Sequence, residues 1–341
     1  MKNKNKNITH NHNTTKTNEK ATKKIKNWAE YNKSLVKRGN LSIFISDSLI
    51  RNGCITTPKK TNEPGRPQKY SNELIEFMLT IRELFHLPLR QTAGFVSFLF
   101  SSMGIISGIP DYTTISKRMP NIKIRYYGKV HRNNNEGIVM LIDSSGFKVF
   151  GEGEWKVRKH GVNKRRTWRE THIAINHETR DIVGFINTSA HVHDNTQLLP
   201  LLQQVTKNNY RIQTVIGDGA YETKDNYNLV KQFNASMIAP PRKNATYHYD
   251  LKDGKLVDVL GWEERNNVIR NVMRMGLDNW KDKVGYHRRS LVENAFYRWK
   301  TIFGVNLKSR KEETQYTEQC LRAKIINRFN EIGLPKYDVV G

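Results

Sequence analysis

Four residues near the C-terminal end of the chain have side chains and spacing that suit phosphate and metal binding: Tyr286, Arg289, Glu293 and Lys300. If the segment is helical from Tyr286, steps of about 100° per residue place the four side chains within roughly 60° of one another. The opposite side would carry an apolar stripe consisting of Leu291, Ala295, Trp299 and Ile302. A solvated amphipathic helix would show the same pattern, so the helix alone does not define a site.

Two aspartates upstream follow apolar runs. Asp143 closes the run 138–142 and Asp218 closes the run 215–217, which predicts both carboxylates at the ends of buried strands of an α/β sheet. Adjacent strands would bring them together, because ligand sites in open sheets form outside the carboxyl ends of strands. With Glu293 as a third ligand, the set is a hard oxygen site, which favours Mg²⁺ or Mn²⁺ over zinc. For either aspartate alone, a turn or helix cap is the alternative.

Three motifs occur in one order along the chain. They are Asp143-Ser144-Ser145-Gly146 leading into 151–155, then Asp218-Gly219-Ala220-Tyr221, then Tyr286, Arg289, Glu293 and Lys300 with two, three and six intervening residues. Together they resemble the DDE transposases of bacterial insertion sequences, in the IS-five family branch. The resemblance runs from about Asn27 to the C-terminus.

This resemblance implies an α/β fold in which an RNase H-like catalytic domain, a mixed five-stranded sheet with flanking helices, follows a helical DNA-binding region. The metal-binding residues it implies are Asp143, Asp218 and Glu293, with Mg²⁺ as the cofactor and Mn²⁺ as a substitute. The DNA-backbone contacts it implies are Tyr286, Arg289 and Lys300, although a half-buried aromatic residue is the alternative for Tyr286. Such roles suit phosphoryl transfer, which needs mainly positioning and charge neutralisation.

Cleavage of DNA follows from these residues, because two metal ions can clamp a phosphodiester. Transfer of the freed 3′-hydroxyl to target DNA follows only from the resemblance, and so does a homodimer on paired terminal repeats. No heptad or other dimer signal is visible. A metal-dependent nuclease that never joins DNA and a non-catalytic regulator derived from a transposase remain the rival functions.

Composition agrees with a nucleic-acid partner. The formal net charge is +25 and the pI is about 9.9, as expected for a polyanion-binding protein, although a ribosomal or chromatin-like protein would be equally basic. Cys54 and Cys320 are the two cysteines, too few for a disulfide framework or a zinc module. No stretch is long and apolar enough for a membrane span or a signal peptide, so we expect a cytoplasmic protein acting on the chromosome.

The chain divides into four expected regions: a disordered basic tail (1–27), a helical N-terminal DNA-binding region (28–130), the catalytic domain (131–310) with an insertion at about 244–283, and a C-terminal helix (311–341). Three helical segments between 71 and 119, the third capped by Asp111, could form a helix-turn-helix or a purely structural bundle. The run 64–67 resembles an AT-hook core, with a linker turn as the alternative. We assign no function to the insertion.

A basic and aromatic loop follows the first predicted catalytic strand. Its candidate DNA contacts are Trp155, Lys156, Arg158, Lys159, Arg165 and Arg166. If Asp143 holds a metal ion, this loop would lie over the substrate path and contact phosphates or stack on a displaced base. A charged, solvated hairpin is the alternative.

The histidines are expected to be structural. His191 and His193 would share one face of a strand and could ligate a metal ion, but Asp194 is placed to cap the following helix and the resemblance assigns the metals elsewhere. His172 lies in an apolar strand and is expected to be a core residue.

Overall fold

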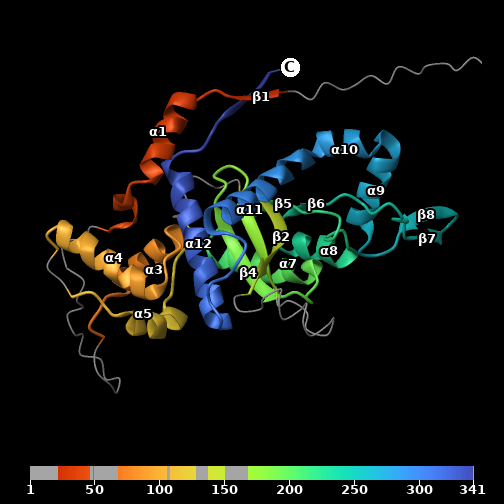
Figure 1. The fold of residues 1–341 in the computed structure, drawn as a ribbon. Helices are drawn as coiled ribbons and strands as arrows, with labels where there is room; N and C mark the ends of the chain where they lie inside the picture. The colour runs from red at the N-terminus through yellow and green to blue at the C-terminus, as the bar shows by residue number, and fades with distance from the viewer. Residues whose placement is uncertain are drawn as a thin grey trace, which may run out of the picture.

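The computed structural model describes residues 22–46, 49, 68–105, 108–127, 137–149 and 168–340. At its centre is a five-stranded sheet (Figure 1). The strands are β2 (Ile138–Lys148), β3 (Trp168–Asn176), β4 (Ile182–Ser189), β5 (Ile212–Ile216) and β6 (Ser236–Ile238). In the spatial order β4-β3-β2-β5-β6, the first three strands are antiparallel, whereas β5 and β6 run parallel to β2. This mixed sheet confirms the predicted α/β class and RNase H-like fold.

Helices surround the sheet. The N-terminal ones are α1 (Trp28–Arg38), α3 (Asn72–Leu84), α4 (Leu89–Ser102) and α5 (Tyr112–Arg118). Within the sheet region lie α7 (Leu198–Lys207), α8 (Lys224–Gln232), α9 (Glu263–Met275), α10 (Leu277–Val284), α11 (Ser290–Phe303) and α12 (Glu312–Ile332). The 3₁₀ turns are η1 (Leu41–Phe44), η2 (Met119–Asn121), η3 (Asp194–Gln197) and η4 (Tyr286–Arg289). Two small sheets pair β1 (Thr22–Ile25) with β9 (Tyr337–Val340) and β7 (Tyr249–Lys252) with β8 (Lys255–Asp258).

The two faces of the sheet support two hydrophobic cores, because alternate residues of a strand point to opposite sides. Met140 and Ile142 of β2 belong to the core that includes α7 and α8. Leu141 and Phe147 belong to the larger core, which includes α11, α12 and the N-terminal helices. The N-terminal helices therefore share one core with the sheet.

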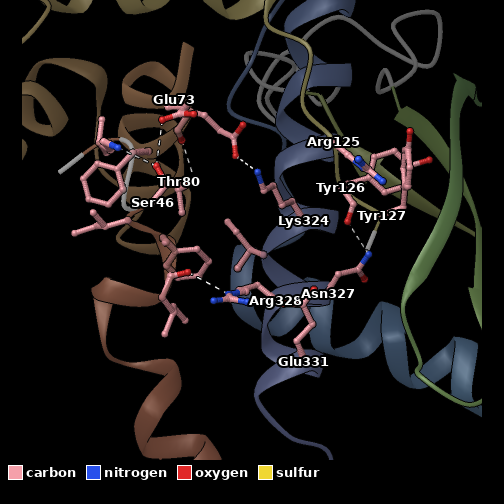
Figure 2. Close-up of a pocket in the computed structure, with 17 residues that line it drawn as sticks. Ser46, Glu73, Thr80, Arg125, Tyr126, Tyr127, Lys324, Asn327, Arg328 and Glu331 are labelled. Carbon is pink, nitrogen blue, oxygen red and sulfur yellow. Dashed lines mark hydrogen bonds and ion pairs between the residues drawn. The ribbon is translucent and has the colours of Figure 1, made fainter. Parts of the chain in front are cut away.

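The three helices predicted between 71 and 119 are α3, α4 and α5. Asp111 caps the third as expected, because its Oδ1 accepts hydrogen bonds from the amides of Thr113 and Thr114 at 2.6 and 3.1 Å. The cavity of about 450 Å³ between residues 43–46, α3 and α12 (Figure 2) is lined by two ion pairs of the chain itself, Lys324 with Glu76 and Arg328 with Glu331, the latter at 2.6 Å. The AT-hook-like run 64–67 lies outside the described residues.

Both ends of the chain differ from expectation. The tail predicted to be disordered through residue 27 instead has strand β1 at Thr22–Ile25, paired antiparallel with β9. The predicted C-terminal helix ends at Ile332, shortly before Pro335, which cannot donate the next helical hydrogen bond, and the chain then extends into β9. The two segments are more than 300 residues apart, and each gives the other a backbone partner that neither sequence reveals.

Candidate active site

Asp143 lies within β2, not at the end of the strand as predicted. The strand continues to Lys148 because β3 pairs with it as far as Trp168. The parallel pairing with β5, in contrast, ends at Leu141 and Ile216. Asp143 and Asp218 both lie two residues beyond that last pair, so the adjacent strands β2 and β5 bring the two carboxylates together as predicted.

The signature segment begins as a 3₁₀ turn rather than as one continuous α-helix. Tyr286 to Arg289 form η4, after Gly285 with a φ of +66°, and the α-helix α11 begins at Ser290. The buried face of α11 includes Val292, Ala295, Phe296, Trp299 and Phe303. Of the predicted apolar stripe, Ala295 and Trp299 are buried, whereas the other two residues are half-buried. The opposite face of α11 leaves Glu293 accessible beside the sheet.

The guanidinium of Arg289 contacts all three predicted catalytic carboxylates. Its Nη2 lies 3.3 Å from Oδ1 of Asp143 and 3.8 Å from Oδ2 of Asp218, and its Nη1 donates a hydrogen bond to Oε1 of Glu293. In the described part of the chain, no three acidic, histidine or cysteine side chains are arranged to hold a single ion. The three carboxylates instead converge on Arg289, which supplies a positive charge between them.

Burial and charge have opposing effects on these groups. Burial raises the pKa of Asp143, while the charge of Arg289 lowers it and the two other carboxylates raise it further. Burial also opposes the charge of Arg289, but the carboxylates outweigh that effect, so the pKa of Arg289 is raised. The site thus holds three carboxylates close enough to interact, and it needs a cation to compensate them.

The donor chemistry of this cluster fits a divalent cation. Its ligating atoms are carboxylate oxygens, the donors that Mg²⁺ and Mn²⁺ prefer, and a positive group already lies among them. Asp143 is only 17% exposed and Glu293 is 56% exposed, so the cluster is open on the side of α11.

Lys300 and Tyr286 lie near the cluster without contacting its carboxylates directly. Nζ of Lys300 donates a hydrogen bond of 2.6 Å to Oγ of Ser145 and lies 5.4 Å from the centre of the Phe147 ring. Tyr286 is half-buried, with its ring centre 6.5 Å from that of Trp280. Burial raises the pKa of the Tyr286 phenol. Lys300 therefore has a fixed position two residues along β2 from Asp143.

Sequence reasoning missed Glu170. This residue of β3 lies opposite Gly146 of β2, and its carboxylate accepts a hydrogen bond from the Ser144 side chain. Burial raises its pKa, whereas Ser144 and the charge of Lys300 lower it. No motif contains Glu170, because it reaches the site only through the pairing of β2 with β3.

Asp194 does not cap a helix as predicted, since no side-chain hydrogen bond caps either η3 or α7. Its Oδ1 lies 3.5 Å from Nδ1 of His172, whose Nε2 lies 3.0 Å from the Thr188 hydroxyl. His172 is fully buried, as expected of a core residue, and burial lowers its pKa while Asp194 opposes that shift. The long-range contact with β3 outcompetes the local cap.

The six candidate DNA contacts of the loop, Trp155, Lys156, Arg158, Lys159, Arg165 and Arg166, lie outside the described residues. No helix in the described ranges is long and apolar enough to cross a membrane.

Two family models match this chain, and several solved structures are similar to it. A family model described as "Transposase DDE domain" matches residues 134–328, and a second model with the same description matches 36–152. The chain is also similar to the piggyBac transposase in a synaptic complex with hairpin DNA, with 9% identity, a TM-score of 0.37, and coverage of 87% of this chain and 74% of that one. The Drosophila P element transposase in a strand transfer complex gives 9% identity and a TM-score of 0.31 over 88% and 85% of the two chains. The Mos1 strand transfer complex gives 12% identity and a TM-score of 0.22, over 81% of this chain and 82% of that one.

The first model alone covers more than half of the chain, from before Asp143 to beyond Lys300. It therefore spans β2, β5 and α11, the three elements that bring the carboxylates together around Arg289. The chain belongs to the family of DDE transposases.

Proposed function

We propose that this transposase cleaves DNA strands at the ends of an insertion sequence of the IS-five branch and transfers the 3′-hydroxyl ends to target DNA by two-metal phosphoryl transfer. The observation that carries the proposal is the convergence of Asp143, Asp218 and Glu293 on Arg289. Three carboxylates from β2, the end of β5 and α11 meet at one edge of the sheet, where the donor chemistry suits a hard cation.

Asp143, Asp218 and Glu293 would hold Mg²⁺, with Mn²⁺ as a substitute. Bound there, the ions would polarise a phosphodiester and neutralise the charge that develops on its oxygens. Arg289 contacts one oxygen of each carboxylate, so it would compete with ions for those oxygens. Its guanidinium would also be able to donate two parallel hydrogen bonds to a phosphate of the DNA backbone.

Lys300 would act on the DNA backbone as a point charge. Its hydrogen bond to Ser145 fixes the ammonium group next to the strand that carries Asp143, so a phosphate held at the carboxylates would lie within its field. Tyr286 would contact the backbone from the start of the same segment. The loop residues Trp155, Lys156, Arg158, Lys159, Arg165 and Arg166 would contact DNA phosphates or stack on a displaced base, and the helices of the region 28–130 would read the ends of the element.

DNA cleavage and joining test the proposal directly. The substrate is DNA carrying the ends of the element with Mg²⁺ or Mn²⁺, and the proteins are the wild type, Glu293→Gln and a control, Glu313→Gln, at an exposed position on α12. We expect Glu293→Gln to bind the ends and to lose both products, while the control keeps both. Equal activity in Glu293→Gln would refute the carboxylate assignment.

The same assay separates the rival functions. A wild-type protein that cuts the ends and never joins them would be a metal-dependent nuclease. A wild-type protein that binds the ends without cutting would be a regulator derived from a transposase.

A further inference from the structure

The β7–β8 hairpin, residues 249–258, projects beyond α9 and away from the central sheet (Figure 1). We name it the arm. Among the described strands, β7 and β8 pair only with each other. Asp253 and Gly254 have φ values of 49° and 71°, as in the tight two-residue turns that favour hairpins. A two-stranded hairpin alone is only marginally stable in water, so the arm requires support.

That support comes from α9 at the base of the arm. The fully buried Asn266 donates hydrogen bonds to the carbonyl of His248 at 2.7 Å and to Oδ1 of Asp258 at 2.9 Å. Arg270 donates to both oxygens of Asp258, at 3.0 and 2.8 Å. The His248 ring stacks on Trp262 with their centres 3.6 Å apart. Both strands are thus fixed to α9 without any contribution from the side chains of the outer arm.

The outer arm exposes an apolar face. Leu251 and Leu256 are directly opposite each other in the strand register, so they lie on the same face. Tyr249 and Asp258 share this face at the base of the arm, where Asn266 and Arg270 hold the Asp258 carboxylate. The exposed fractions are 72% for Leu251, 66% for Leu256 and 55% for Tyr249. A rigidly supported apolar face of this kind is typical of an interaction site, because burying it costs little conformational entropy.

The charge of this region favours a protein partner over DNA. The segment 244–283 carries seven Lys and Arg residues and seven Asp and Glu residues, so it is neutral in a chain with a net charge of +25. The arm itself has two lysines and three aspartates. A surface that binds phosphates would have a surplus of cations, which the arm lacks.

Charge also points to a second copy of the chain as the partner. Two molecules that each carry +25 repel each other over most of their surfaces, and a neutral projecting segment is where they can approach most closely. Leu251, Leu256 and Tyr249 on one arm offer the same apolar side chains to an identical arm. An isologous contact about a two-fold axis therefore matches both the charge and the shape.

We propose that the arm is the self-association surface of this transposase and that the apolar faces of two arms pack against each other. The inference rests on the proposed function, because joining both ends of an element requires two active sites to be held together. The arm is small compared with a standard interface of about 800 Å² per partner, so the association is reversible and concentration-dependent.

Sedimentation of the full chain over a range of concentrations tests this. The variant is Leu251→Lys with Leu256→Lys, and the matched control is Val36→Lys with Phe98→Lys, whose wild-type side chains are similarly exposed at 76% and 72%. We expect the wild type and the control to form dimers. The arm variant should weaken the dimer at least about a hundredfold, because four leucines are lost from the contact. At concentrations where both proteins are monomeric, its Tm should equal that of the wild type, since the substituted side chains are exposed.

Three results would overturn the proposal: a wild type that is monomeric at every soluble concentration, an arm variant that dimerises like the wild type, or an arm variant that stays dimeric and loses affinity for a single DNA end. Cleavage of a single DNA end, measured in parallel, separates this inference from the proposed function. An inactive wild type that dimerises through the arm refutes the function alone. An active wild type whose arm variant remains dimeric refutes the arm alone.

Discussion

Replacing Arg289 by glutamine probes the carboxylate cluster most directly. Glutamine keeps a polar side chain and removes the positive charge that contacts Asp143, Asp218 and Glu293. Without a metal ion, the variant leaves three interacting carboxylates without that compensating charge. We expect it to be less stable than the wild type and to bind a divalent cation more tightly.

The structure sets the size of the stability loss. The contact of Arg289 with the exposed Glu293 contributes about 0.3–0.5 kcal/mol, as other helical i, i+4 pairs do. Arg289 and Asp143 are 16% and 17% exposed, so their pair lies between an exposed pair, at about 0–1 kcal/mol, and a fully buried one, at about 3–5 kcal/mol. A total loss of about 2 kcal/mol lowers the Tm by roughly 3 °C in a chain of 341 residues, because the entropy of unfolding scales with chain length.

The same energy sets the gain in metal affinity. In the wild type, an ion would compete with the guanidinium for the carboxylates, and in the variant this competition is absent. About 2 kcal/mol corresponds to roughly thirtyfold tighter binding. Isothermal titration with Mn²⁺ measures the affinity, and calorimetric melting with and without Mn²⁺ measures the stability.

Two controls accompany the variant. Arg274→Gln removes an arginine of α9 whose side chain contacts Asn271 and not the cluster, and it should change neither quantity. Asp143→Asn removes a proposed metal ligand and should abolish the binding of Mn²⁺. The reasoning is refuted if Arg289→Gln binds Mn²⁺ no more tightly than the wild type, or if its Tm is unchanged in the absence of metal.

Three further predictions concern other sites. Lys300→Met removes the ammonium group held by Ser145 and should slow single-turnover cleavage about a hundredfold while end binding persists; an unchanged rate would contradict a role at the phosphate. Arg322→Met leaves Glu83, which is buried between α3 and α12, without its closest cation and should cost about 3–5 kcal/mol in urea unfolding; a loss below about 1 kcal/mol would show that the pair is dispensable. Burial raises the pKa of Asp181, so its contribution to stability is full below the unfolded pKa and is lost as the pH rises through the folded pKa. Asp181→Asn should therefore raise the Tm at neutral pH and not near pH ~4, the usual pKa of aspartate, and calorimetry at both pH values checks this.

Local patterns in the sequence were sufficient to predict the elements that hold the proposed catalytic residues. The apolar runs before Asp143 and Asp218 correctly indicated buried strands, and helical spacing correctly placed Ala295 and Trp299 against the sheet. Capping by Asp111 was also predictable, because it involves only the next three residues. These features depend on side-chain periodicity and on contacts within one turn, which a sequence displays directly.

Contacts between distant segments were decided by the tertiary structure. The pairing of β2 with β3 extends the strand through Asp143 and brings Glu170 to the site, and the pairing of β1 with β9 orders residues at the two ends. Asp194 contacts His172 instead of capping a helix. In each case a polar group or a free strand edge had several possible partners, and the packing of the whole chain selected one.

The sequence by itself therefore determined the candidate catalytic residues and the main strands and helices that hold them, because spacing and hydrophobic periodicity are local properties. Only the tertiary structure decided that Arg289 lies among the three carboxylates and that the N-terminal helices share the core of the sheet. Both depend on the meeting of segments far apart in the chain, and the free energy that selects such contacts comes from burial and charge compensation in the folded state.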